Sequence, residues 1–140
     1  MTKSAAPKMN KKALLREESI GRLTQAAFRL IVAKGYHACT LQDIAEAAGL
    51  TKGAIFFYFE SKENLLLQLL DIAEAHIVDP LIEHLDEKRG TAPEKIASFF
   101  RFTSKQGIDR PHELLCLIKM SIESRTGTDI ADRRVSEIYE

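Results

Sequence analysis

Hydrophobic positions recur at helical spacing along most of the chain. Between residues 14 and 34 they fall three or four places apart, which predicts one long amphipathic helix. The apolar face of this helix consists of Ile20, Leu23, Ala27, Leu30 and Ile31. Gly35 follows directly, and we expect it to end the helix in the left-handed conformation that glycine adopts at low cost. No segment alternates Val, Ile or Thr over the length of a strand, so the pattern predicts an all-α fold.

Shorter helices are predicted along the rest of the chain, because hydroxyl side chains, prolines and glycines mark their ends. Thr40 and Asp43 fit a capping box, and Thr51 and Ser61 are expected to cap the next two helices. Pro80 is suited to kink the helix that begins at Lys62 or to start a new turn. The expected helices cover about 41–48, 52–59, 62–78 and 81–85, then Thr91 to Gly107, Asp109 to Gly127, and Asp129 onward.

Five small or apolar residues between positions 41 and 58 have the spacing of a helix-turn-helix. They are Ile44, Ala45, Gly49, Leu50 and Ile55. The three large side chains would form the core between two helices, and the alanine must be small because the second helix crosses close above it. The glycine supplies a positive φ in the tight turn. A generic helical hairpin would satisfy one or two of these requirements and rarely all five.

Charge is unevenly distributed, although the chain as a whole is neutral. Residues 1–62 carry ten Lys and Arg against five Asp and Glu, and residues 63–140 carry ten against fifteen. This asymmetry fits a polyanionic partner at one end of the chain, and it fits ordinary charge scatter on solvated helices equally well. We expect three segments: a basic disordered arm at 1–13, a helix-turn-helix domain at 14–60 and a helical regulatory domain at 61–140.

Several classes of protein are not expected from this composition. The sequence has no run of about 18 apolar residues, and its first ten residues lack the apolar core of a secretory signal. Cys39 and Cys116 stand far apart without metal-ligand spacing, and no catalytic motif is present. We therefore expect a cytoplasmic protein without enzymatic activity, metal ion or cofactor. A redox role for Cys39 is much less favoured than a buried or incidental thiol.

The predicted helix at 52–59 is the second of the helix-turn-helix, and such a helix normally lies in the major groove. Gly53 and Ala54 are small enough for close approach, and Lys52 can bond to guanine or to a phosphate. Thr40 and Lys62 are further candidates for phosphate contacts. The alternative for Lys62 is a solvated lysine at a helix start, where the helix dipole mildly disfavours a cation.

Four consecutive aromatic residues at 56–59 point in about four directions around this helix. We expect Phe59 in the core, and Tyr58 together with Phe56 or Phe57 partly exposed on the DNA side. An exposed ring can touch a thymine methyl group or the sugar backbone, and the Tyr58 hydroxyl can bond to a phosphate. The alternative is that all four rings belong to the core.

A dense and ordered series of matches resembles the DNA-binding domain of the tetracycline-repressor-like (TetR) family. The matches, within about residues 20–66, are Ala26-Ala27-Phe28, Gly35-Tyr36, Thr40 to Ala45, Ala48 to Gly53 and Phe56 to Leu65. The resemblance implies three DNA-binding helices, a connecting fourth helix, and a larger helical domain that binds a small molecule and forms a homodimer. It also implies a repressor that binds double-stranded DNA at a palindromic operator. A small-molecule inducer would release it by moving the fourth helix and spreading the two DNA-binding heads.

The resemblance also implies contacts for individual residues. Positions that often contact DNA in the family are Thr40, Gln42, Thr51, Lys52, Gly53, Phe57, Tyr58 and Lys62. Phe56 stands where the family usually has a tyrosine whose hydroxyl bonds a phosphate, whereas Tyr58 replaces a frequent histidine and is expected to compensate. The family usually has about nine helices, so the resemblance implies either a truncated chain or an unusually short member. If the chain is truncated, we expect an incomplete regulatory domain, a weakened dimer and an exposed apolar face on the fifth to seventh helices.

The small-molecule site is expected among the fourth to seventh helices, although periodic apolar residues are more often plain core. Candidate wall residues are Phe99, Phe102, Leu115, Cys116, Ile118, Met120 and Ile122. Two alternatives to a ligand-released repressor stay open at this point. One is an activator that uses the same helix-turn-helix, and the other is a helical protein-interaction module that does not bind DNA.

Overall fold

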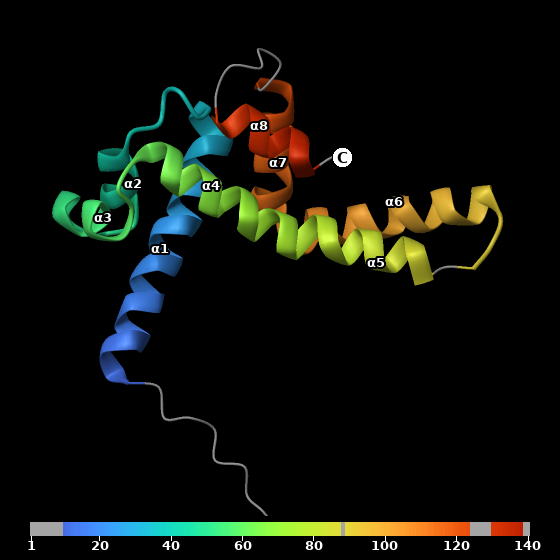
Figure 1. Cartoon of the computed structure of the whole chain (residues 1–140), viewed down its shortest axis with the longest axis horizontal. Coiled ribbons are helices and arrows are strands. Elements are labelled where there is room, and N and C mark those ends of the chain that lie inside the picture. The colour runs from blue at the N-terminus through green and yellow to red at the C-terminus, as the bar shows by residue number, and fades with distance from the viewer. Residues whose placement is uncertain (1–9, 88, 124–129, 139–140) are drawn as a thin grey trace, which may run out of the picture.

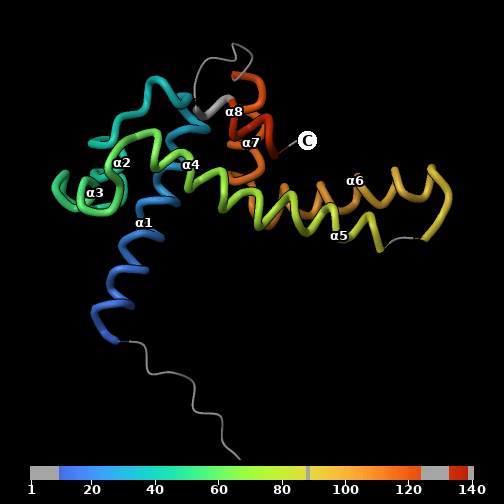
Figure 2. Tube along the Cα trace, in the orientation of Figure 1, coloured from blue at the N-terminus to red at the C-terminus, as the bar shows by residue number. Residues whose placement is uncertain are grey.

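The computed structural model describes residues 10–87, 89–123 and 130–138, and every regular element among them is helical. Figures 1 and 2 show a globular part from which two antiparallel helices, α5 and α6, project as a hairpin. We call α1 to α4 the head, and the pair α5 and α6 the hairpin. The elements are α1 (Lys11–Lys34), α2 (Leu41–Ala47), α3 (Lys52–Tyr58), α4 (Lys62–Ala73), the π-helical turn η1 (Glu74–Val78), α5 (Asp79–Glu87), α6 (Ala92–Asp109), α7 (Pro111–Glu123) and α8 (Ile130–Ile138).

Helix α1 begins earlier than expected and ends with a different backbone conformation. The Asn10 side chain accepts a hydrogen bond from the Lys12 amide at 3.2 Å, which starts the helix at Lys11. Residues 11–13 of the predicted disordered arm are therefore helical, while residues 1–9 lie outside the described part. Gly35 has the positive φ that we expected (89°). Its ψ of 160° is extended, so the prediction of a left-handed helical conformation at this cap was wrong.

Hydroxyl caps start the next three helices, as predicted. The Thr40 hydroxyl accepts from the Asp43 amide at 3.1 Å while the Asp43 carboxylate accepts from the Thr40 amide at 3.0 Å, which completes the capping box. Thr51 caps α3 by accepting from the Ala54 amide at 3.2 Å, and Ser61 caps α4 in the same way. These caps fix where the short helices of the head begin.

Two prolines account for the geometry of the longer helices. Pro80 lacks an amide hydrogen and its ring would crowd the carbonyl four residues earlier, and the wide turn η1 lies directly before it. The expectation that α6 ends at Gly107 was wrong, because the helix continues to Asp109. It stops there because Pro111 disfavours helical backbone at Arg110, which has φ −137° and ψ 55°. The predicted break at Gly127 lies outside the described residues.

A single hydrophobic core joins the head to α7 and α8. Its fully buried members in the head include Leu23, Ile44, Ile55, Phe59, Leu65, Leu66, Leu69 and Leu70. Cys116, Leu117 and Met120 of α7 and Val135 and Ile138 of α8 belong to the same cluster. The boundary expected at residue 60 is therefore not a break in the core.

Polar contacts reinforce this junction at both ends of the core. The Lys119 ammonium donates to the Val32 carbonyl at 3.0 Å, where α1 approaches its end. Arg134 of α8 binds the carboxylates of Asp71 and Glu74, and these ion pairs hold α8 against the end of α4. Helices α7 and α8 are thus attached directly to the elements that carry the helix-turn-helix.

Candidate nucleic-acid interface

The helix-turn-helix scaffold is formed by α2 and α3 as the spacing predicted. Ile44, Ala45 and Ile55 are each 1% exposed or less, and Leu50 is half-buried against them. Gly49 has φ 67°, which confirms the positive φ expected for the turn. The Leu50 amide donates to the Ala45 carbonyl at 2.8 Å and closes the turn. All five scaffold positions have the environment that a helix-turn-helix requires.

Arg22 of α1 supports this turn from outside, a role that the sequence pattern did not predict. Its guanidinium donates to the Ala48 carbonyl at 2.6 Å and lies 3.4 Å from the Gly49 carbonyl. These carbonyls have no partner within α2 because they lie at its end. A Cβ at position 49 would lie 2.9 Å from the Arg22 Nη2, so the turn is tightly enclosed. An arginine beside the buried Leu23 carries no periodic signal that would have identified it.

Helix α3 presents a mixed cationic and aromatic surface to solvent. Lys52 and Gly53 are exposed, Phe56 is 47% exposed and Phe57 is 79% exposed. Tyr58 is half-buried and Phe59 is fully buried. The expected partition of the four rings is therefore confirmed, and the alternative in which all four belong to the core is wrong.

The polar candidates around α3 already have partners within the protein. Gln42 donates to the Glu46 carboxylate at 3.0 Å. The Lys62 ammonium lies 4.3 Å from the centre of the Tyr36 ring and donates to the His37 carbonyl at 3.3 Å. Lys62 thus ties the start of α4 to the segment before α2, a structural role in addition to the phosphate contact that we expected.

The eight candidate DNA-binding residues lie at one end of the molecule. They are on the start of α2, on α3 with its cap, and at the start of α4, which is the end remote from the tip of the hairpin (Figure 1). Thr40, Gln42, Thr51, Lys52, Gly53 and Phe57 are exposed, and Tyr58 and Lys62 are half-buried. The structure thus places the whole predicted set on neighbouring elements of the head.

Two titratable groups near this surface, Asp43 and Cys39, have pKa values shifted from their ordinary values. Hydrogen bonds from the backbone and side chain of Thr40 lower the pKa of Asp43, with a smaller contribution from Lys34. Burial raises the pKa of the Cys39 thiol, and nearby Lys62 opposes that shift. Cys39 is fully buried, which agrees with the favoured expectation for this residue.

The candidate ligand-binding residues have different environments in the part of the chain that the structure describes. Cys116 and Met120 belong to the core, and burial raises the pKa of Cys116 to about 12. Leu115, Ile118 and Ile122 are 47%, 46% and 64% exposed on α7. Phe99 borders a shallow cavity of about 300 Å³ between the ends of α5 and α6. Phe102 stacks on His84, with ring centres 5.1 Å apart.

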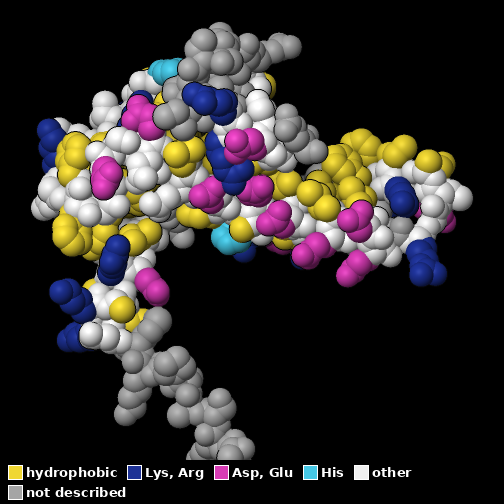
Figure 3. Space-filling model, viewed as in Figure 1, with side chains coloured by type: hydrophobic (Ala, Val, Ile, Leu, Met, Phe, Trp, Pro, Cys, Tyr) yellow, Lys and Arg dark blue, Asp and Glu magenta, His cyan; other side chains and the backbone are white. Residues whose placement is uncertain are grey.

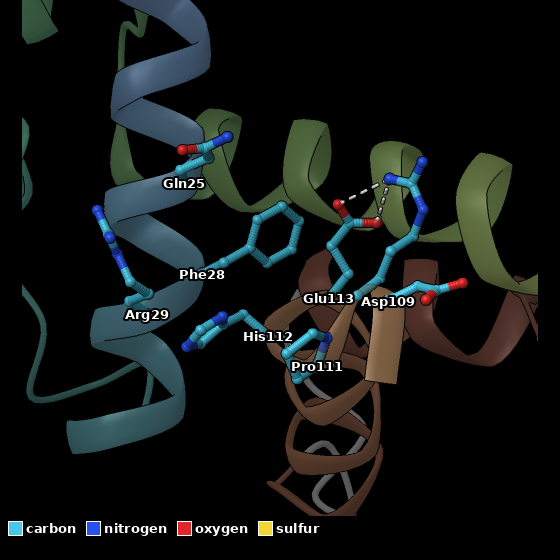
Figure 4. Close-up of a pocket in the computed structure, with 8 residues that line it drawn as sticks. Gln25, Phe28, Arg29, Asp109, Pro111, His112 and Glu113 are labelled. Carbon is cyan, nitrogen blue, oxygen red and sulfur yellow. Dashed lines mark hydrogen bonds and ion pairs between the residues drawn. The ribbon is translucent and has the colours of Figure 1, made fainter. Parts of the chain in front are cut away.

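A larger cavity of about 500 Å³ lies between α1 and the junction of α6 with α7. Its lining residues, drawn in Figure 4, are Gln25, Phe28, Arg29, Asp109, Arg110, Pro111, His112 and Glu113. Glu113 pairs with Arg110 at 3.3 Å and with His76 of η1 at 3.0 Å. This cavity contains none of the candidate wall residues, although His112, which could be a polar contact to a ligand and is more simply a surface histidine, lies in its lining.

Metal sites and membrane spans are both absent from residues 10–87, 89–123 and 130–138. No group of three or more His, Cys, Asp or Glu in these ranges is arranged to hold a metal ion. Within the same ranges, no helix combines the length and apolar character that crossing a bilayer requires.

Comparison with known proteins identifies the class of this fold. The description "Bacterial regulatory proteins, tetR family" matches residues 23–69, which include α2, α3 and most of α4. The fatty acid metabolism regulator protein of Bacillus subtilis (strain 168) is 34% identical over 76 residues, covering 54% of this chain and 39% of the relative. The transcriptional regulator TtgR of Pseudomonas putida is 41% identical over 61 residues, covering 43% of this chain and 29% of the relative.

Solved structures give the same result over most of the chain. The MbdR regulator from Azoarcus sp. CIB superposes with a TM-score of 0.76 and 36% identity, covering 86% of this chain and 63% of that one. FadR from Bacillus subtilis, solved in complex with stearoyl-CoA, has a TM-score of 0.65 and 26% identity, covering 85% and 62%. The fold is that of a helix-turn-helix regulatory protein. Residues 23–69 match the TetR family of bacterial regulatory proteins, and the chain spans well under half the length of the curated relatives described above.

Proposed function

We propose that this chain binds double-stranded DNA through α3 and thereby regulates transcription. The observation that carries the proposal is the outward surface of α3. This surface is held on a helix-turn-helix scaffold with every required position in place, and it exposes Lys52, Gly53 and Phe57. A helix held in this way fits the major groove, where side chains contact base edges.

Phosphate contacts are proposed for the residues that flank α3. Thr40 and Thr51 use their hydroxyl oxygens to accept from backbone amides, and a hydroxyl that accepts can still donate to a phosphate oxygen. Tyr58 carries a hydroxyl directly after the aromatic pair, which supports its proposed compensation for the hydroxyl that Phe56 lacks. Lys62 is held in place by Tyr36 and His37, so its ammonium would meet a phosphate with little loss of side-chain freedom.

We further propose a homodimeric repressor that a small molecule releases from a palindromic operator. FadR from Bacillus subtilis was solved with stearoyl-CoA bound, so a long-chain acyl-CoA is the first effector to test on this chain. Support within this chain comes from the continuous core and from Arg134 and Lys119, which attach α8 and α7 to the head. A displacement of these helices would be transmitted to α1 and α4.

Selection of bound sequences from random duplexes with the 140-residue chain tests DNA binding. We expect one enriched sequence, with a binding constant that falls steeply as salt concentration rises. Loss of binding on addition of stearoyl-CoA would support ligand release. A reporter gene placed behind the enriched sequence then distinguishes repression from activation.

Three lysine variants test where the DNA lies. Lys62→Ala is expected to weaken binding to all sequences and to reduce the salt slope by about one unit. Lys52→Ala is expected to alter the sequence preference if this side chain bonds to a base. Lys95→Ala, which removes an exposed lysine of the hairpin, is the matched control and should change neither quantity. Failure to bind any duplex at low salt would favour the alternative of a protein-interaction module.

A further inference from the structure

We propose that Phe57 recognises a thymine in the DNA site by packing its ring against the 5-methyl group of that base. This inference rests on the proposed function and deepens it, because it names the base feature that α3 detects. It makes Phe57 a specificity-determining residue, distinct from side chains that only grip the sugar-phosphate backbone.

The exposure of Phe57 is not required by the fold. The inner side of α3 is filled by Ile55 and, just past the end of the helix, by Phe59, both of which have no exposed surface. The Phe57 ring points away from this core and is 79% exposed. Burial of such an exposed apolar ring against a partner lowers the free energy, because it removes the ring from water. Single exposed rings are common in proteins, so the neighbours on α3 must identify the partner.

Those neighbours make a small-residue face beside the ring. Gly53 lies four positions before Phe57 and Ala54 three positions before it, so all three share one side of the helix. A Cβ added at Gly53 would meet no nearer atom than the Thr51 hydroxyl, at 4.0 Å. The backbone of α3 can therefore approach a flat surface closely, with the Phe57 ring as the main side chain there. The floor of the major groove is such a surface, and thymine is the base that presents a methyl group on it.

Phe56 is a natural control, because its surroundings differ although its residue type is the same. Its ring shares the adjacent side of α3 with Lys52, whose ammonium lies 5.9 Å from the ring centre. That side is cationic and suits a phosphate or a guanine edge. Phe57 has its close aromatic contact with Tyr58 instead, with ring centres 5.2 Å apart. The two rings should therefore respond to different parts of the DNA.

Deoxyuridine substitution tests this proposal directly, because it removes the 5-methyl group and changes nothing else on the base. In the duplex enriched by selection, each thymine is replaced in turn, and the affinity of the 140-residue chain is measured by fluorescence anisotropy at one salt concentration. We expect a loss of about fourfold at one thymine position in each half-site, which corresponds to the roughly 0.8 kcal/mol of one buried methyl-sized group. Phe57→Gln should bind the thymine and uracil duplexes equally. Phe56→Gln should keep the fourfold difference.

Other outcomes would overturn the proposal. They are an enriched sequence without thymine, a wild-type chain that binds every uracil duplex as tightly as the parent, or a fourfold difference that persists in Phe57→Gln or disappears in Phe56→Gln. In each case the chain still binds the selected duplex, so the proposed function would stand while this inference fails. A Phe57→Gln variant with wild-type affinity for all duplexes would instead indicate that the ring faces a protein partner. Recovery of no duplex at all would contradict the proposed function itself. Thermal unfolding followed by circular dichroism verifies that both variants fold.

Discussion

The head and the hairpin both contain large apolar side chains, but they use them differently. In the head, the large apolar residues that face inward are almost completely buried, and polar groups cap the helices or hold the turn. In the hairpin, Ser98 is the one residue with a fully buried side chain among those described, and Ile96, Phe99 and Phe100 are 57%, 38% and 62% exposed. Figure 3 shows apolar side chains gathered along the projecting part of the molecule. The head therefore lies within a well-buried core that it shares with α7 and α8, whereas the hairpin depends on its neighbours and on contacts at its base.

Truncation of one phenylalanine in each region should show the largest difference between them. Phe59→Ala removes a fully buried ring from the head and should lower the free energy of unfolding by about 3–5 kcal/mol. Phe100→Ala removes a ring that is mostly exposed and should change it by less than about 0.5 kcal/mol. Urea unfolding of both variants measures the two values. Equal losses would mean that the hairpin rings are buried in solution and that the comparison is wrong.

Glycine-to-alanine substitution should have opposite signs in the two regions. Gly49 has φ 67°, so Gly49→Ala should cost about 1–2 kcal/mol, and its Cβ would also press on the Arg22 guanidinium at 2.9 Å. Gly107 lies inside α6, where an added Cβ makes an ordinary 3.6 Å contact with Leu114. Gly107→Ala should therefore stabilise the protein by about 0.5–1 kcal/mol. Thermal unfolding of the two variants checks the signs, and stabilisation by both would refute the need for glycine at the turn.

The glycines also illustrate what could be predicted from the sequence. The positive φ of Gly49 was predictable because the helix-turn-helix spacing places this residue in a tight turn. The predicted helix end at Gly107 was wrong because a glycine alone does not end a helix. The actual stop, at Asp109, follows from Pro111 two residues later. Local caps and the helix-turn-helix core were predictable because they depend on neighbours within a few residues.

Contacts between distant segments were not predictable from the pattern. Arg22 lies 26 residues before the carbonyl that it binds, and Lys119 lies 87 residues after its partner. The candidate DNA surface comes from the spacing and from the family resemblance, and both it and the candidate ligand site stay predictions. Apolar periodicity on α6 and α7 does not distinguish side chains that enter the core, such as Met120, from those that stay exposed, such as Leu115.

Removal of the hydrogen bond between the buried Ser98 and the half-buried His84 in the hairpin should have a smaller and more local effect. The Ser98 hydroxyl lies 2.8 Å from His84 Nε2, and this hydrogen bond links α6 to α5. Ser98→Ala should cost about 1 kcal/mol and leave His84 without this partner. Hydrogen exchange should then accelerate at the amides of α5 and α6 and stay unchanged in the head. Uniform acceleration over the whole chain would indicate that head and hairpin open as one unit, which would remove the distinction between them.

The smallest expected effect is the pH dependence of the capping box in the head. Hydrogen bonds from Thr40 lower the pKa of Asp43 from its ordinary value of 3.8, so the ionised carboxylate stabilises the folded state. That contribution is complete at neutral pH, declines as pH drops below the ordinary value, and is lost once pH falls through the lowered pKa. Asp43→Asn should therefore be less stable than the wild type at about pH 7, and the difference should shrink towards about pH 3. The matched variant in the hairpin is Glu94→Gln, which disrupts the hydrogen bonds that Thr91 donates to the Glu94 carboxylate at the start of α6. Its stability is measured over the same pH range. A difference between Asp43→Asn and the wild type that does not change with pH would show that the carboxylate charge adds nothing to the cap.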